Sequence, residues 1–192
     1  GSEMCIRDSA KSGQWWETEP QRALANNSVA YKSKPEMGTF MREWLALYDS
    51  KSGERGIFNR EAADKQVSRN GRREAGHMWG TNPCSEIILR PYQFCNLSEV
   101  VVREHDTLKT LERKVRLATI LGTIQSTLTD FKYLRKVWKD NTEEERLLGV
   151  SLTGIMDNPM TSKAGERLNV LLGLLKHEAV RTNAAMAKQL GI

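Results

Sequence analysis

The chain has 192 residues, enough for one globular domain with a sizeable buried core. Hydrophobic residues make up 39% of it and charged residues 28%, which excludes a disordered or fibrous chain. The net charge of +5 arises from Lys and Arg that alternate with Glu and Asp, as in Arg42-Glu43, so solvated helix faces are favoured over a nucleic-acid partner.

The N-terminus lacks the basic and apolar regions of a secretory signal, and no window holds the roughly 18 to 20 apolar residues of a membrane-spanning helix. Three cysteines do not make a disulfide framework, so we expect a cytoplasmic protein with free or catalytic thiols and no membrane partner. The first residues, from Gly1, have no apolar periodicity. We interpret residues 1–14 as a tag or sequence artefact and discount Cys5 with them.

The first predicted elements are two helices. Apolar residues recur at spacings of three and four from residue 35 to residue 48, which predicts an amphipathic helix. Asn59 is then a favourable N-cap for a short polar helix, which Gly71 would close in a left-handed conformation.

Residues 81–103 have no helical period. They predict two extended segments, around 87–89 and 100–102, joined by a turn at Pro91-Tyr92. We expect the second segment to fold back against the first.

A long helix is expected after these segments, capped by Asp106 or Thr107 and reaching Ile124. After a break near residues 126–130, the helical pattern continues to Trp138.

Thr142 and Glu145 have the spacing of a capping box, which predicts a helix start. Residues 147–155 form a short apolar run with two glycines, typical of a buried strand or of a loop that passes close to a ligand. Ser162 would cap a last helix that ends near Gly191.

Helices alternate with short apolar stretches, so an α/β fold is expected. Only three or four strands are indicated, and buried parallel strands need neighbours on both sides. The sequence therefore predicts a piece of a larger sheet.

The candidate chemistry lies in Thr81 to Glu86. Asn82, Cys84 and Glu86 occupy alternate positions, and alternate side chains of an extended backbone point to the same side. Pro83 favours that conformation because its ring excludes the helical region for Asn82. An amide, a thiol and a carboxylate could therefore converge on one polyol ligand.

Cys95 lies eleven residues after Cys84 at the head of the next apolar run, and two thiols near one substrate indicate redox chemistry. Three alternatives remain open. A cysteine is more often a small buried hydrophobe than a catalyst. His77 and His105 could join the two cysteines in a zinc site, although the spacings match no usual zinc pattern, or serve Cys84 as the base of a hydrolytic nucleophile.

The residues Gly80 to Ile87, Pro91-Tyr92 and Phe94 to Leu97 resemble the active-site loop and following strand of adenosylcobalamin-dependent ribonucleotide reductases. Residues 22–29, 52–63 and 148–155 are also similar to this family, so the resemblance runs from about residue 15 to the C-terminus. It implies that residues 15–192 are a central fragment of a ten-stranded α/β barrel that carries an active-site finger loop.

The resemblance also implies residue roles. Homolysis of the cofactor's cobalt–carbon bond would produce a radical that takes the hydrogen of Cys84, and the resulting thiyl would remove the 3′ hydrogen of the ribose. Glu86 would act as general base, Asn82 would hold the ribose hydroxyls, and Cys95 would be one half of the redox dithiol. The partner of Cys95 belongs to an upstream strand with no counterpart here, and Cys5 is not assigned.

The implied activity is reduction of ribonucleoside triphosphates to 2′-deoxyribonucleotides, with an external dithiol such as thioredoxin as reductant. The triphosphate preference depends on the stretch Arg90 to Phe94. Diphosphate substrates, a different radical source and a non-catalytic nucleotide-binding module remain alternatives. No cofactor-contact residues and no metal ligands are assigned, and we expect the chain to need the remainder of the reductase for turnover.

Overall fold

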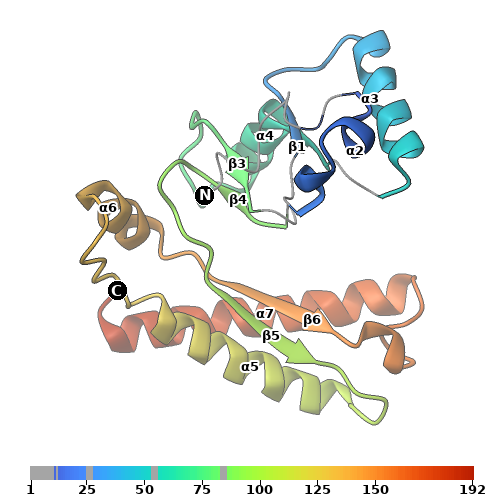
Figure 1. Ribbon diagram of the computed structural model, residues 1–192. Helices are drawn as coiled ribbons and strands as arrows, with labels where there is room; N and C mark the ends of the chain where they lie inside the picture. Colours follow the sequence, from blue (N-terminus) through green and yellow to red (C-terminus); the bar gives the residue numbers. More distant parts are fainter. Residues whose placement is uncertain (1–10, 12, 25–27, 53–55, 83–85) are drawn as a thin grey trace. The chain divides into compact units, whose positions relative to one another are not determined.

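The computed structural model describes residues 11, 13–24, 28–52, 56–82 and 86–192 (Figure 1). The chain divides into two compact units, residues 1–93 and 94–192, which are taken here one at a time. The described strands form three two-stranded sheets and no closed barrel. The predicted α/β class is confirmed, whereas the ten-stranded barrel stays a prediction.

The first unit opens with a parallel strand pair. Its first elements are α2 (Trp15–Thr18), η1 (Pro20–Leu24), β1 (Ser28–Tyr31), α3 (Met37–Ser50) and β2 (Gly56–Asn59). β1 and β2 pair in parallel with Ser28 opposite Gly56, because α3 returns the chain to the starting edge. α3 confirms the amphipathic helix predicted from the spacing of apolar residues.

The predicted polar helix is α4 (Arg60–Asn70), and both of its predicted caps are confirmed. Asn59 Oδ1 accepts a hydrogen bond of 3.0 Å from the Ala62 N–H, and Gly71 ends the helix at φ +60°. Ala63 and Val67 of α4 then pack with Phe58 and Trp79 in a small core.

The first unit ends in a hairpin of β3 (Gly80–Thr81) and β4 (Ile88–Leu89). Gly80 lies opposite Leu89, and Thr81 lies opposite Ile88. The expectation that the apolar run at 87–89 pairs with the later run at 100–102 is wrong, because the run at 87–89 pairs with residues immediately before the loop. The turn at Pro91-Tyr92 is confirmed, and Tyr92 has φ +60°.

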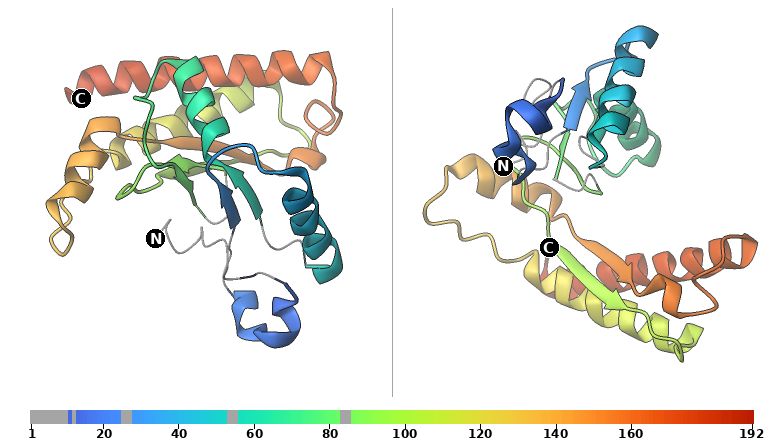
Figure 2. Two further views of the ribbon diagram at one scale, coloured as in Figure 1. Left: turned by 90° about the horizontal axis from the view of Figure 1, so that it is seen from above. Right: turned by 45° about the vertical axis from the view of Figure 1, so that its right-hand side comes forward.

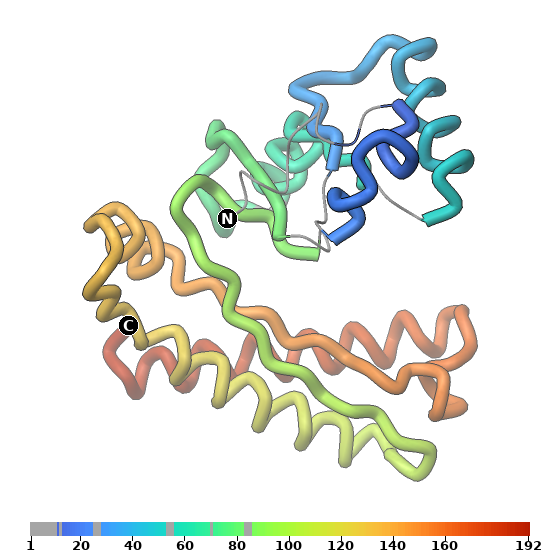
Figure 3. The backbone as a smooth tube through the Cα atoms, in the orientation of Figure 1, coloured from blue at the N-terminus to red at the C-terminus, as the bar shows by residue number. Residues whose placement is uncertain are grey.

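The second unit is a parallel strand pair with long helices. Its elements are β5 (Leu97–Val101), α5 (Leu108–Gln125), α6 (Lys136–Glu145), β6 (Gly149–Thr153), η2 (Ile155–Asp157) and α7 (Glu166–Leu190). The chain leaves β5, passes through α5 and α6, and returns as β6, with Leu97 opposite Gly149 (Figure 3). α5 lies against both strands and α7 runs along α5 (Figure 2).

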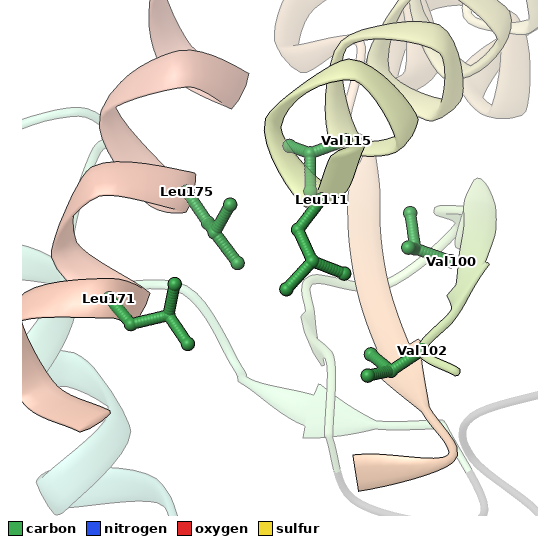
Figure 4. Packing of buried hydrophobic residues seen from close by; sticks show 6 residues of the cluster. All are labelled: Val100, Val102, Leu111, Val115, Leu171 and Leu175. Carbon is green, nitrogen blue, oxygen red and sulfur yellow. The ribbon is translucent and has the colours of Figure 1, made fainter. Parts of the chain in front are cut away.

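The core of the second unit lies between β5 and the two long helices. Val100 and Val102 meet Leu111 of α5, and Leu171 and Leu175 of α7 close the other side (Figure 4). Burial alternates along β5, with Ser98 and Val100 buried and their neighbours exposed. One face of this strand pair is therefore covered by helices.

The helix boundaries of the second unit differ from the predictions at three positions, the first of which is α6, because this helix begins at Lys136 and not directly after residue 130. Thr107 caps α5 as predicted. Thr142, however, lies inside α6, where its hydroxyl donates 2.7 Å to the carbonyl of Trp138 instead of starting a helix. Ser162 does not cap α7, which begins after Gly165 without a side-chain cap.

Candidate functional site

The β3–β4 hairpin presents the loop that carries the predicted chemistry. Its base is buried, with Thr81 at 1% and Asn82 at 8% exposure. The Asn82 N–H donates to the Ile87 carbonyl at 3.3 Å, and the Ile87 N–H donates to Asn82 Oδ1 at 3.0 Å. These two bonds close the loop at its stem.

Asn82 and Glu86 meet across this loop. Asn82 Nδ2 donates a hydrogen bond to Glu86 Oε1. Asn82 is buried at the stem of the loop, whereas Glu86 is exposed to solvent. The convergence predicted for these two side chains is therefore present.

The predicted cause of this contact, an extended backbone from Asn82 to Glu86, is wrong. An extended strand would carry Glu86 about 13 Å from Asn82 over four residues. The two side chains meet instead because the chain reverses direction between β3 and β4. Cys84 lies outside the described residues, so its predicted role stays a prediction.

The base of the hairpin is anchored by residues that the sequence reasoning missed. Trp79 is fully buried, and its indole N–H donates 2.8 Å to Asp64 Oδ1. The same oxygen accepts 2.7 Å from the Gly76 N–H, and these two bonds, the Gly76 bond foremost, lower the pKa of Asp64. Arg60 Nε donates 2.9 Å to the Trp79 carbonyl. No spacing rule in the sequence connects these positions.

Cys95 belongs to the second unit, where its side chain is exposed. It borders a cavity of about 230 Å³ that also includes Asn96, Thr142 and Arg146. Phe94 supplies an aromatic wall, with its ring 4.7 Å from that of Trp138. Polar and aromatic groups thus surround the access to this thiol.

The residue after Cys95 fixes the backbone at the start of β5. Asn96 Nδ2 donates 2.8 Å to the Gly122 carbonyl on α5, and the Asn96 carbonyl accepts 2.8 Å from the Gly149 N–H at the start of β6. The Asn96 side chain therefore ties the cysteine segment to the helix layer.

The face of the β5–β6 pair opposite the helices is uncovered within the second unit. Leu97 is 43% exposed and Val101 is 39% exposed, and Glu99 and Ser151 are exposed as well. Cys95 lies two positions before the start of β5. The strand pair thus has one structural face and one face open to a ligand or to further chain.

The zinc and hydrolytic alternatives both include Cys84, which lies outside the described residues, so both stay open. In the part of the chain that the structure describes, no three His, Cys, Asp or Glu side chains gather as a metal site. His77 Nε2 lies 3.4 Å from Arg90 Nη1, and its ring packs edge-on against Trp79. His77 is thus accounted for by contacts within the hairpin base.

Two pockets are found among the described residues of the second unit. One is the cavity of about 230 Å³ beside Cys95, and the other is a groove of about 450 Å³ between β5 and α5. None of the helices described is long and apolar enough to cross a membrane.

The comparisons with known proteins agree on one family. The family model described as "Ribonucleotide reductase, barrel domain" matches residues 10–192. An adenosylcobalamin-dependent ribonucleoside-triphosphate reductase of Lacticaseibacillus paracasei is 32% identical over 143 residues, which cover 71% of this chain and 18% of that relative. The chain thus spans less than a fifth of the length of this curated relative. No solved structure matches the chain significantly.

Proposed function

The chain belongs to the ribonucleotide reductase barrel-domain family, and from this premise we propose that it carries the radical-bearing cysteine and one of the two redox cysteines of an adenosylcobalamin-dependent ribonucleoside-triphosphate reductase. In this proposal residues 15–192 are a central fragment of the catalytic barrel, and residues 1–14 lie outside it. Cys84 bears the transient thiyl radical, and Cys95 is one half of the redox dithiol.

The observation that carries the proposal is the pairing of Asn82 with Glu86 at the stem of the loop that contains Cys84. An amide that donates and a carboxylate that accepts, two positions before and after a cysteine in the sequence, provide the groups needed to act on adjacent ribose hydroxyls. The hydrogen bond also keeps both side chains oriented before substrate binds.

Glu86 would accept the proton of the 3′-hydroxyl as the Cys84 thiyl removes the 3′ hydrogen. The carboxylate is exposed and therefore accessible to a substrate. Asn82 would exchange its bond to Glu86 for a bond to a ribose hydroxyl, and its buried position limits the orientations available to the sugar.

Cys95 would supply reducing equivalents. The balanced reaction joins one ribonucleotide and two thiols and gives one 2′-deoxyribonucleotide, one water and one disulfide. The 2′-hydroxyl leaves as water, the carbon is reduced, and the two sulfurs are oxidised. The second sulfur belongs to a cysteine that this chain does not assign, and an external dithiol such as thioredoxin would restore both thiols.

The cofactor and substrate parts of the proposal depend on the relative, whose name specifies adenosylcobalamin and ribonucleoside triphosphates. When bound, the cofactor would supply the radical for Cys84. We further propose that turnover requires the remainder of the reductase chain. The proposed location is the cytoplasm.

The test is an assay of the full-length protein with a ribonucleoside triphosphate or diphosphate and dithiothreitol, with and without adenosylcobalamin. We expect deoxynucleotide formation that requires the cofactor and prefers the triphosphate. Activity without cobalamin would indicate a different radical source, and a diphosphate preference would reverse the substrate assignment. Nucleotide binding without any reduction would favour a non-catalytic module.

A further inference from the structure

We infer that Arg73 is a positioning residue that holds the strand on which the Asn82–Glu86 loop is mounted. This inference rests on the proposed function, because it concerns the geometry of the proposed site. Arg73 follows α4 in the polar connection before the hairpin, and nothing in its local sequence distinguishes it from Arg72.

Arg73 bonds to β4 and to the segment that follows it. Its Nη1 donates 2.7 Å to the carbonyl of Ile88 in β4, and its Nη2 donates 3.2 Å to Gln93 Oε1. Gln93 Oε1 also accepts 3.0 Å from the backbone N–H of Arg90. Gln93 itself is only 6% exposed, so these bonds lie in a protected environment.

The guanidinium also lies over the buried ring of Trp79, with Cζ 4.7 Å from the ring centroid. Trp79 immediately precedes β3, and Ile88 belongs to β4. One planar cation therefore contacts β4 through its donors and, through its stacking on Trp79, the residue that leads into β3. Lysine cannot reproduce this geometry, because an ammonium has no planar face and no rigid pair of donors.

This placement has a direct consequence for the loop. Ile88 lies one residue beyond Ile87, whose N–H and carbonyl both bond to Asn82. A shift of β4 along β3 would therefore move Glu86 relative to Asn82. Small displacements of reacting groups have large effects on rate, whereas substrate binding can depend on contacts elsewhere.

The experiment compares Arg73→Met and Arg73→Lys with Arg72→Met in the full-length protein. Arg72 is the matched control, because it is the adjacent exposed arginine and no bond of its side chain is found among the described residues. Steady-state kinetics would be measured with and without added guanidinium at a concentration that leaves the wild type unaffected. The alkylation rate of Cys84 by iodoacetamide, followed by mass spectrometry, provides a second readout that does not need turnover.

We expect Arg73→Met to lower kcat by about 10- to 100-fold, the range for lost hydrogen bonds to a charged group, with KM changed by less than about threefold. Arg73→Lys should lower kcat by nearly as much. Added guanidinium should restore part of kcat to Arg73→Met. The rate of Cys84 alkylation should differ from that of the wild type in both variants. Arg72→Met should match the wild type.

The inference is overturned if Arg73→Met keeps kcat and the Cys84 alkylation rate of Arg72→Met. It is also overturned if kcat and melting temperature fall together in Arg73→Met without guanidinium rescue, because that result describes a structural role only. A failure of the proposed function is distinct, since it would appear as deoxynucleotide formation by a Cys84→Ser variant whatever Arg73 does.

Discussion

The side-chain amide of Asn82 donates a hydrogen bond to the carboxylate of Glu86, across the loop that connects β3 to β4. The bond links a buried donor to an exposed acceptor. In the proposed function, a substrate hydroxyl would reach the carboxylate from solvent and then share the amide. Replacement of Glu86 is therefore the most specific test of the general base proposed for this loop.

Replacing Glu86 by Gln should preserve the fold and the hydrogen-bonding shape of the loop but remove the base. We expect kcat to fall by about 100- to 10,000-fold, the usual contribution of a general base, with nucleotide binding kept within a few-fold. The measurement is kcat at neutral pH beside the nucleotide affinity of the same variant. Glu74→Gln, an exposed site in the same unit, is the control, and equal rates in the two variants would exclude Glu86 as base.

Replacing Gly154 by Ala should destabilise the second unit. Gly154 has φ +70°, and an added Cβ would overlap the backbone oxygen of Val102. We expect a loss of about 1–3 kcal/mol in the free energy of unfolding, measured by urea denaturation. Gly173→Ala is the matched control within α7, where a Cβ meets nothing within 4 Å, and it should stabilise by about 0.5–1 kcal/mol. A neutral Gly154→Ala would refute the close approach.

Caps were predictable from sequence where one local bond decides the structure. Asn59 and Thr107 each satisfy a helix N–H within three residues, so the signal is contained in the segment itself. Thr142 has an equally good pattern but lies inside α6, because its hydroxyl bonds back to the helix carbonyl of Trp138. Local pattern alone cannot choose between these two uses of a threonine hydroxyl.

The contact between Asn82 and Glu86 was predictable from sequence, but the geometry that produces it was not. Asn82 and Glu86 were identified from spacing, but they meet through loop closure and not along an extended chain. Arg73 and Asp64 were missed because their partners lie 12 to 20 residues away in sequence. Such pairs depend on tertiary packing, which no periodicity reports.

Glu178 should make the stability of the second unit depend on pH. Hydrogen bonds from Arg181 and then Arg116 lower the pKa of Glu178 to about 2 from its ordinary value of 4.5. A folded-state pKa below the unfolded value adds stability above pH 4.5, and this stability is lost as pH falls toward about 2. Urea denaturation at a series of pH values measures the effect.

Glu178→Gln should therefore be less stable than the wild type at neutral pH, and the difference should shrink on acidification. Asp130→Asn is the control, because the side chain of Asp130 is 82% exposed and its lysine neighbour is 4.0 Å away. A constant difference between wild type and Glu178→Gln from pH 7 to pH 2 would contradict the assignment of this ion pair.

The proposed radical role of Cys84 is tested most directly by deoxynucleotide formation in the full-length Cys84→Ser variant. The assay contains adenosylcobalamin, a ribonucleoside triphosphate and dithiothreitol, with the wild type measured beside the variant. A serine hydroxyl is close in size to a thiol but cannot relay a radical under these conditions. We predict no detectable product from Cys84→Ser while nucleotide affinity stays within a few-fold of the wild type. Product formed at a rate comparable to the wild type would contradict the role of Cys84 and the function proposed for this chain.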